Sequence, residues 1–351
     1  MVAAEIAQTL QLTPRQVNYG LKGVQGWLAQ RGVAMQVTPG VGVTLGGSDS
    51  QRTALFAELA AKPDFQLVLA AEERQQLLIL HLLTVQDPLI LYQLQQGIQV
   101  SRTTILKDLN LIEGWFSTFG LTLKRRPNHG IWLDGSEKNQ RHALAALLWG
   151  AHPFGDPLTK MTHTNGLVFR LATDADYLPI VRQANEALPQ WNVQRALGQV
   201  AYAEAQLGGR FTDDTVLHLS LVLAIQIQRV QQGRYLDADP STQNWLKSLA
   251  VWPVASQICR RLFGGKTAVC PDPEIGNIAI HLLASARNGR WPGDLEIDTT
   301  FVDLMAALMQ YTAGAYGLPH LTDDVALRDG LISHVVPACL QQRFDMWGGP
   351  R

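Results

Sequence analysis

The amino-acid sequence predicts a mainly α-helical chain of several domains, in which a small module of helices and a β-hairpin occurs twice before a longer all-helical region. Three observations carry this prediction. The chain has 351 residues, of which 46% are apolar, and this length exceeds what one hydrophobic core usually holds. A segment near the N-terminus recurs later in the chain, and the apolar residues beyond about residue 177 follow a helical period.

The repeat aligns residues 11–48 with residues 99–136 without a gap, at a constant offset of 88. Its identities fall on residue types that shape turns and cores. Chance is a poor explanation for such a set, so the sequence predicts one module in two copies. The identical pairs are Leu21 and Leu109, Gly26 and Gly114, Trp27 and Trp115, Gly32 and Gly120, Pro39 and Pro127, Gly42 and Gly130, Leu45 and Leu133, and Gly47 and Gly135.

The second copy begins with two predicted helices. Residues 89–94 form a short helix, residues 96–99 form a turn that contains Gly97, and Ser101 is a suitable N-cap for a helix that extends to about Phe116. The apolar residues of the longer helix share one face, so the polar residues of its first turns point outward. The buried face is expected to hold Ile105, Leu109, Ile112 and Phe116.

A β-hairpin is predicted next, because the apolar residues then alternate. Residues 121–123 and 131–133 provide the two strands, and residues 126–130 provide the turn. The order of helix, turn, helix and hairpin is that of a winged helix-turn-helix module.

The first copy follows the same plan. A helix over residues 5–10 precedes Thr13, which caps a helix that begins at Pro14, and a hairpin turn lies at residues 39–42. The second copy has one more predicted helix upstream, over residues 72–83, whose counterpart in the first copy would precede Met1. This difference leads us to expect a chain that is trimmed at its N-terminus.

The exposed residues of the two modules favour contact with double-stranded DNA. A recognition helix in the major groove brings short polar side chains and cations to the base edges, while a basic hairpin follows the backbone or the minor groove. A solvated face or a protein-interaction module also explains such charges, so the prediction rests on the whole pattern. The predicted DNA-binding residues are Arg102, Thr103, Thr104, Lys107, Lys124, Arg125, Arg126 and His129 in the second copy, and Arg15, Gln16, Asn18 and Lys22 in the first.

Composition and motifs argue against several other classes of protein. No uninterrupted apolar run reaches the roughly 18 residues that a membrane span needs, and the net charge of -1 argues against a protein that coats nucleic acid wholesale. The three cysteines, Cys259, Cys270 and Cys339, have neither a metal-ligand spacing nor a disulfide-rich pattern, so a reducing cytoplasm is expected. Because common catalytic motifs are missing, we expect neither an enzyme nor a cofactor.

Residues 100–109 (VSRTTILKDL), continued by residues 126–131 and 134–137, resemble the second DNA-binding module of mannitol-operon-type activators. These are antiterminator-like regulators controlled by the phosphoenolpyruvate-sugar phosphotransferase system (PTS). In that family the DNA-binding modules precede two all-helical PTS regulation domains, whose histidines are phosphorylated by carriers of the PTS. The resemblance therefore implies a cytoplasmic DNA-binding regulator of a sugar uptake or utilisation operon, of the activator type.

Two histidine motifs of these regulation domains have counterparts further along the chain. Residues 273–283 form a glutamate-led helix that carries His281 amid apolar residues, and residues 330–337 carry His334. The resemblance implies that His281 and His334 are phosphorylated.

Other histidines fit the pattern less well. Val222 stands where the family has the first histidine of the first regulation domain, and His218 lies one helical turn earlier, so we expect no role for His218. His142, His152 and His163 are scattered around a predicted loop and are expected to be incidental.

The sequence therefore predicts two modules followed by regulation domains. A PTS phosphocarrier protein, a double-stranded DNA operator and a second copy of the chain are the expected partners, since paired half-sites and symmetric regulation domains go together. No membrane partner is expected. The predicted boundaries are 1–60 for the first module, 70–150 for the second, 172–293 for the first regulation domain and 297–351 for the first half of a second one.

Two other functions remain open from the sequence. One is an RNA-binding antiterminator, because related regulation domains also occur with RNA-binding β-domains, although recognition helices suit the major groove of duplex DNA. The other is a PTS-sensing interaction module that does not bind DNA, which the sparse charge of the first copy permits.

Overall fold

The computed structural model is mainly helical, and its chain divides into two compact units. The first unit comprises Met1–Gly135, His152–Met161 and Phe169–Gln190, and the second comprises Ser136–Ala151, Thr162–Val168 and Trp191–Arg351. The structure describes residues 3–9, 13–38, 42–61, 69–162, 168–171, 178–188, 191, 193–263, 270–286 and 299–346.

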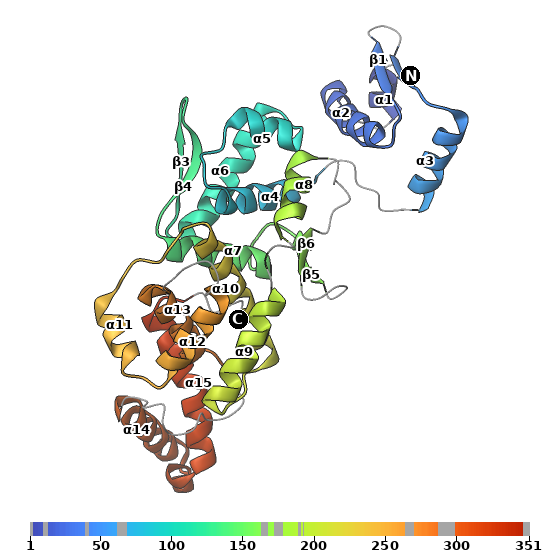
Figure 1. Cartoon of the computed structure of the whole chain (residues 1–351). Coiled ribbons are helices and arrows are strands. Elements are labelled where there is room, and N and C mark those ends of the chain that lie inside the picture. The colour runs from blue at the N-terminus through green and yellow to red at the C-terminus, as the bar shows by residue number, and fades with distance from the viewer. Residues whose placement is uncertain are drawn as a thin grey trace. The chain divides into compact units, whose positions relative to one another are not determined.

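The repeat seen in the sequence is a repeat of structure (Figure 1). The offset of 88 maps α2 (Pro14–Gln30) onto α6 (Arg102–Thr118) residue for residue. It also maps α3 (Asp49–Ala61) onto α7 (Glu137–Trp149), so the repeat extends to a third helix beyond the aligned segment. The other repeated elements are α1 (Ala3–Thr9) with α5 (Leu91–Ile98), β1 (Met35–Thr38) with β3 (Thr122–Arg126), and β2 (Gly42–Leu45) with β4 (Gly130–Asp134).

Equivalent positions form the core of each copy. Ile105, Trp115 and Phe116 are buried in the second copy, and their counterparts Val17, Trp27 and Leu28 are buried in the first. The predicted upstream helix is confirmed as α4 (Ala71–Thr84), which packs against α6. A partly buried ion pair joins these two helices, with Arg74 Nε 2.9 Å from Asp108 Oδ2.

The predicted hairpin of the second copy is confirmed, with residues 122–126 antiparallel to residues 130–134. Leu89 extends it by two backbone hydrogen bonds with Ile131, each of 2.8 Å. Gly130 makes this approach feasible, since its φ is +114° and a Cβ there would lie 2.8 Å from the Leu89 carbonyl oxygen. Gly42, its counterpart, has a φ of +113°. The turn between the first copy's strands, at residues 39–41, lies outside the described residues.

Some element boundaries differ from the prediction. The expected helix over residues 89–94 is instead α5 (Leu91–Ile98), and the expected turn at residues 96–99 is wrong because Gly97 lies inside this helix. A Cβ at Gly97 would lie 3.5 Å from Ile180 Cβ, so the glycine serves close packing against α8 (Pro179–Ala187). A short pair of strands, β5 (Thr159–Thr162) and β6 (Val168–Leu171), was not expected.

The second unit is a packed set of helices. Figure 1 shows α9 (Val193–Leu207), α10 (Asp213–Gln231), α12 (Val251–Phe263) and α13 (Asp272–Leu283) together, and α7 packs against α10. Thr212 caps the N-terminus of α10, since its side chain accepts a hydrogen bond from the Thr215 amide at 3.3 Å. The remaining elements are α11 (Pro240–Lys247), α14 (Thr299–Tyr316), the 3-10 helix η2 (Pro319–Asp323) and α15 (Val325–Arg343).

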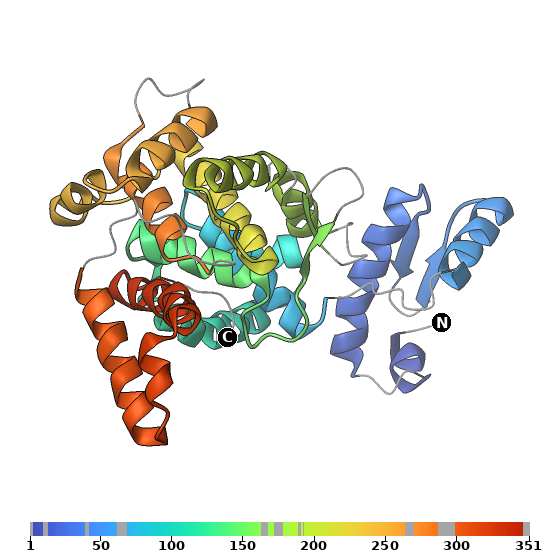
Figure 2. The ribbon, with the colours of Figure 1, turned by 90° about the horizontal axis from the view of Figure 1, so that it is seen from below.

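The helix predicted over residues 273–283 is confirmed as part of α13, and residues 330–337, which carry His334, lie in α15. At the red end of the chain, α14 and α15 pack against each other (Figure 2). Within the described residues, none of the helices combines the length and the apolar character needed to cross a lipid bilayer.

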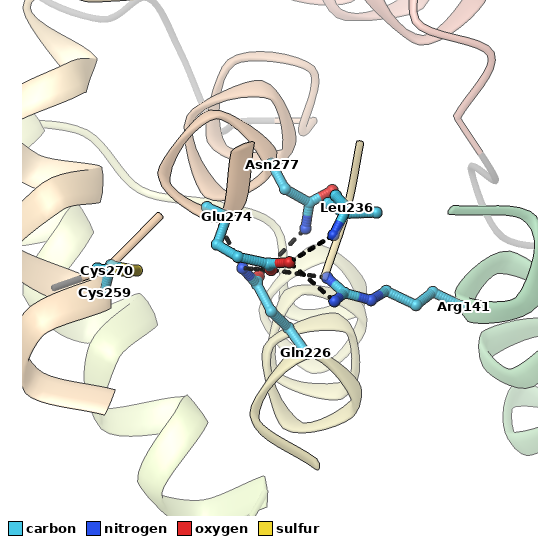
Figure 3. Close-up of a disulfide and its surroundings, with 7 residues drawn as sticks. All are labelled: Arg141, Gln226, Leu236, Cys259, Cys270, Glu274 and Asn277. Carbon is cyan, nitrogen blue, oxygen red and sulfur yellow. Dashed lines mark hydrogen bonds and ion pairs between the residues drawn. A yellow bond between two sulfur atoms is a disulfide. The ribbon is translucent and has the colours of Figure 1, made fainter. Parts of the chain in front are cut away.

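A disulfide joins Cys259 of α12 to Cys270, just before α13 (Figure 3). This pair was not predicted from the sequence. The two cysteines are 11 residues apart, and they meet because α12 and α13 pack together, which their spacing alone does not indicate. Cys339 on α15 is half-buried and free.

Candidate functional site

The first candidate site is the N-terminal end of α6. Ser101 caps this helix, since its Oγ accepts a hydrogen bond from the Thr104 amide at 3.1 Å, and the Thr104 hydroxyl lies 2.8 Å from the same oxygen. Thr104 is therefore engaged in the cap. Arg102, Thr103 and Lys107 are exposed on the helix surface.

The hairpin formed by β3 and β4 carries the other predicted contacts. Lys124, Arg125, Arg126 and His129 are all exposed. Arg125 also fixes the hairpin to α6, because its guanidinium donates to Asn110 Oδ1 at 2.6 Å and to Glu113 Oε2 at 2.9 Å. Lys124 Nζ lies 3.8 Å from Asp134 Oδ2.

Three cations of this region are unengaged. Within the described part of the chain, the side chains of Arg102, Lys107 and Arg126 form neither a hydrogen bond nor an ion pair. We call these three residues the basic surface. In the first copy, Asn18 and Lys22 are exposed, whereas the side chains of Arg15 and Gln16 lie outside the described residues.

The second candidate site lies in the second unit and is supported by a buried carboxylate (Figure 3). Glu274 on α13 has no exposed surface. It accepts hydrogen bonds from Arg141 Nη1 at 2.8 Å, from Gln226 Nε2 at 2.7 Å and from the Leu236 amide at 2.9 Å. These contacts fix the start of α13 against α7 and α10.

A second ion pair extends this network. Arg229 on α10 is 1% exposed, and its Nε donates to Glu137 Oε1 at 2.7 Å. Arg141 Nε donates to the same oxygen at 2.8 Å. Burial alone would raise the pKa of Glu137, but the hydrogen bonds and charges of Arg229 and Arg141 lower it below its ordinary value.

His281 lies one helical turn beyond Asn277 on α13. Its Nδ1 is 2.8 Å from the Asn277 carbonyl oxygen, and a carbonyl only accepts, so Nδ1 carries the hydrogen and Nε2 has the free lone pair. His281 is 6% exposed and lines a pocket of about 320 Å³. We call this the histidine pocket; Lys138, His142 and Asn277 also line it.

The pKa of His281 is lowered to about 4, chiefly by burial and further by the charges of Arg141 and Lys138, although the bond to Asn277 opposes the shift. Burial also lowers the pKa of His142 to about 3, with contributions from His281, Lys138, His218 and Arg141. The imidazole of His281 is therefore neutral near pH 7, as a nucleophilic nitrogen must be.

His142 corrects the prediction of an incidental residue on a loop, because it lies inside α7 and lines the histidine pocket. The signal that was missed is helical spacing: Lys138, Arg141, His142 and Ala145 recur at three- and four-residue intervals and line a narrow recess next to His281. Val222 lines the same recess, so the position expected for a first histidine does lie beside His281.

The other histidines are placed differently. His218 is close enough for the charge of His281 to lower its pKa, after burial, to about 4, and its ring meets Trp149 edge-on. His334 is exposed on α15 and does not line the histidine pocket. His152 stacks on Phe154, and His163 lies outside the described residues. Among the residues that the structure describes, no cluster of His, Cys, Asp and Glu could hold a metal ion.

Comparison with known proteins gives relatives of one kind. No family model matches the chain. It is 23% identical over 351 residues, 97% of this chain and 50% of the relative, to the "Probable licABCH operon regulator" of Bacillus subtilis (strain 168). It is 21% identical over 284 residues, 81% of this chain and 40% of the relative, to the "Transcriptional regulator ManR" of the same organism. The chain thus spans about half the length or less of these curated relatives and is similar, along most of its own length, to regulators of transcription.

Proposed function

We propose that this chain is a DNA-binding transcription regulator of a sugar operon, whose activity is controlled by PTS-dependent phosphorylation of histidines. The observation that carries the proposal is the repeat of two helices and a hairpin, whose second copy exposes the unengaged cations of the basic surface. We interpret both copies as winged helix-turn-helix modules. The names of the two relatives support this interpretation.

In this proposal α6 enters the major groove. Arg102 and Thr103 approach base edges from its first turn, and Lys107 and Arg126 neutralise phosphates. The hairpin lies along the backbone, with Lys124, Arg125 and His129 near it. Arg125 has a second part, because its bonds to Asn110 and Glu113 hold the hairpin at a fixed angle to the helix. Asn18, Lys22, Arg15 and Gln16 contribute the weaker contacts of the first copy.

His281 is the phosphoacceptor that the geometry favours. Its neutral ring, with the lone pair of Nε2 free and a pocket beside it, meets the requirements for phosphoryl transfer. His334 is exposed on α15 and stays a second proposed site. A homodimer, the activator role and a cytoplasmic location belong to the same proposal.

The DNA-binding part is tested by titrating the purified chain with the DNA upstream of its own operon, at about 50 and 200 mM salt. Wild type is expected to bind tightly and lose affinity as salt rises. Arg102→Ala/Arg126→Ala should remove one base contact and one phosphate contact, so affinity falls and the slope of log affinity against log salt becomes shallower by about one.

A control variant with the same change in net charge separates the loss of specific DNA contacts from the effect of net charge. Arg210→Ala/Arg328→Ala removes two arginines of the second unit, whose side chains are 81% and 42% exposed. This variant should bind as wild type does. If wild type itself binds DNA weakly and without salt dependence, the DNA-binding proposal is wrong, and the interaction-module alternative is favoured.

A further inference from the structure

The C-terminal turn of α15 lies at the histidine pocket. Phe344 and Met346 line this pocket together with His281 and Lys138. Lys138 Nζ donates a hydrogen bond to the Phe344 carbonyl oxygen at 2.6 Å and lies 4.0 Å from Asp345 Oδ2. One lysine thus links the turn to α7, the helix that continues the chain directly from the second hairpin.

Within the described residues, this turn has other contacts as well, among them backbone hydrogen bonds from its three amides to carbonyls at the end of α15. The Phe344 ring stacks on Trp245 at 5.8 Å, and Arg343 lies over the same indole at 4.9 Å. Gln341 Nε2 donates to the Ala284 carbonyl at 2.8 Å. Lys138 supplies the charged contact from α7, and its side chain is 42% exposed, so it has room to change partner.

The residues around His281 include cations that would stabilise a negatively charged group on its ring. Lys138 and His142 line both the histidine pocket and the narrow recess next to it, and no carboxylate lines the recess. Arg141 is held by Glu137 and Glu274, so it contributes its field but not a free donor. Asp237 and Asp239 line the wider pocket and would oppose an anion there. Among the described residues that line the recess, the other lysine or arginine is Lys138, whose charge already acts on His281.

We propose that Lys138 is the receptor for a phosphoryl group on His281 Nε2, and that Lys138 releases the Phe344 turn when it binds this group. The inference rests on the proposed role of His281 as phosphoacceptor. A hydrogen bond from an ammonium to a phosphoryl oxygen is stronger than one to a neutral carbonyl, so the equilibrium favours exchange of partner. Because Lys138 belongs to α7, phosphate at His281 changes the contacts of the helix that follows the second module.

The reaction can be carried out without a protein donor. With phosphoramidate, the Nε2 lone pair attacks phosphorus, the N–P bond of the reagent breaks, and ammonia leaves. The Nδ1 proton stays on the ring, where it continues to donate to Asn277. Peptide mass measures phosphate at His281, and hydrogen–deuterium exchange measures opening of the turn through the amides of Phe344, Asp345 and Met346.

The expected result is that phosphorylation of the full-length chain speeds exchange of these three amides by about tenfold or more, the size of effect that loss of one charge-assisted hydrogen bond produces. Lys138→Gln should exchange quickly before treatment and change little afterwards, whereas Lys138→Arg should respond as wild type does. Lys247→Gln, which removes an exposed lysine of α11 outside the pocket, is the control and should also respond. His281→Ala, treated identically, should not respond.

The other outcomes are distinct. If His281 is phosphorylated but exchange of the turn does not change, the role of Lys138 is overturned and the proposed phosphoacceptor stands. If the mass of the His281 peptide does not change, both the phosphoacceptor role and this inference are overturned, while DNA binding by the basic surface is tested separately.

Discussion

Glu274 is fully buried and accepts hydrogen bonds from α7, from α10 and from the backbone of Leu236. Its removal leaves the guanidinium of Arg141 buried without its main partner. We therefore expect Glu274→Ala to lower the free energy of unfolding by about 3–5 kcal/mol, the usual cost of breaking a buried ion pair. Urea unfolding followed by circular dichroism measures this change.

Asp272→Ala provides the matched control on the same helix. Asp272 pairs with Lys247, but their side chains are 44% and 43% exposed, so solvent screens the interaction. The expected loss is below about 1 kcal/mol. A similar loss for the two variants would mean that the Glu274 network contributes no more than a surface pair.

The lowered pKa of His281 predicts that the stability of the folded chain depends on pH. Its pKa in the folded chain is about 4, below the ordinary value of 6.5, so between these values the unfolded chain binds a proton that the folded chain does not. The contribution of neutral His281 to the free energy of unfolding is therefore complete well above pH 6.5 and is lost as the pH falls toward 4. His281 alone should lower the free energy of unfolding by roughly 2 kcal/mol between pH 6.5 and 5. Urea titrations at several pH values measure the slope.

Variants of single histidines show which residues cause this slope of the free energy of unfolding against pH. His281→Asn should have a shallower slope than wild type, and the remaining slope is due to the other histidines whose pKa values burial lowers, namely His81, His142, His152 and His218. An unchanged slope in His281→Asn would contradict a buried, neutral His281.

Residues were harder to predict from the sequence than elements. The resemblance to a motif points to His281, whereas the sequence places His142 near a predicted loop and the structure places it inside α7. Which residues line a pocket depends on how α7 and α13 approach each other, and that contact joins residues more than 130 positions apart, as with Arg141 and Glu274. Local periodicity does not contain this information.

Among the elements, those with a local physical signal were predicted correctly. Ser101 caps α6 as expected, and the hairpin strands fall where the apolar residues alternate. The end of α5 was misplaced because Gly97 looked like a turn residue, although its role is to let α8 approach. The disulfide is likewise not predictable from local sequence, because it depends on how α12 and α13 pack together.

The hairpin offers a test at this scale. Gly130→Ala forces a Cβ to within 2.8 Å of the Leu89 carbonyl oxygen at a φ of +114°, so the extra strand pairing at Ile131 must shift. We expect a loss of about 1–3 kcal/mol. Gly114→Ala is the control, because no atom lies within 4 Å of its Cβ position on α6, and it should be neutral or stabilising by up to about 1 kcal/mol. Thermal unfolding of both variants measures the difference. Equal losses of stability would contradict the claim that a Cβ at residue 130 disturbs the pairing of Leu89 with Ile131.

At the scale of the whole molecule, α7 has two affiliations. By sequence it is the third helix of the second repeat, since it matches α3 at the offset of 88, and the predicted boundaries assign it to residues 70–150. By packing it belongs to the second compact unit, where Glu137 and Arg141 pair with Arg229 and Glu274. The same helix, α7, therefore belongs to the proposed DNA-binding module by sequence and lines the pocket of His281 by packing.

Two fragments test this assignment. Residues 136–351 retain α7, whereas residues 172–351 begin at the predicted boundary of the first regulation domain and lose it. Without α7, Arg229 and Glu274 remain in the helical core but lack their partners Glu137 and Arg141, so the shorter fragment should unfold at lower urea, with a loss of about 3 kcal/mol or more. Glu137→Ala/Arg141→Ala in the longer fragment separates the ion pairs from the rest of the helix and should reproduce much of this loss. Equal stability of the two fragments would show that the regulatory helices are complete without α7, and α7 would then be part of the DNA-binding module alone.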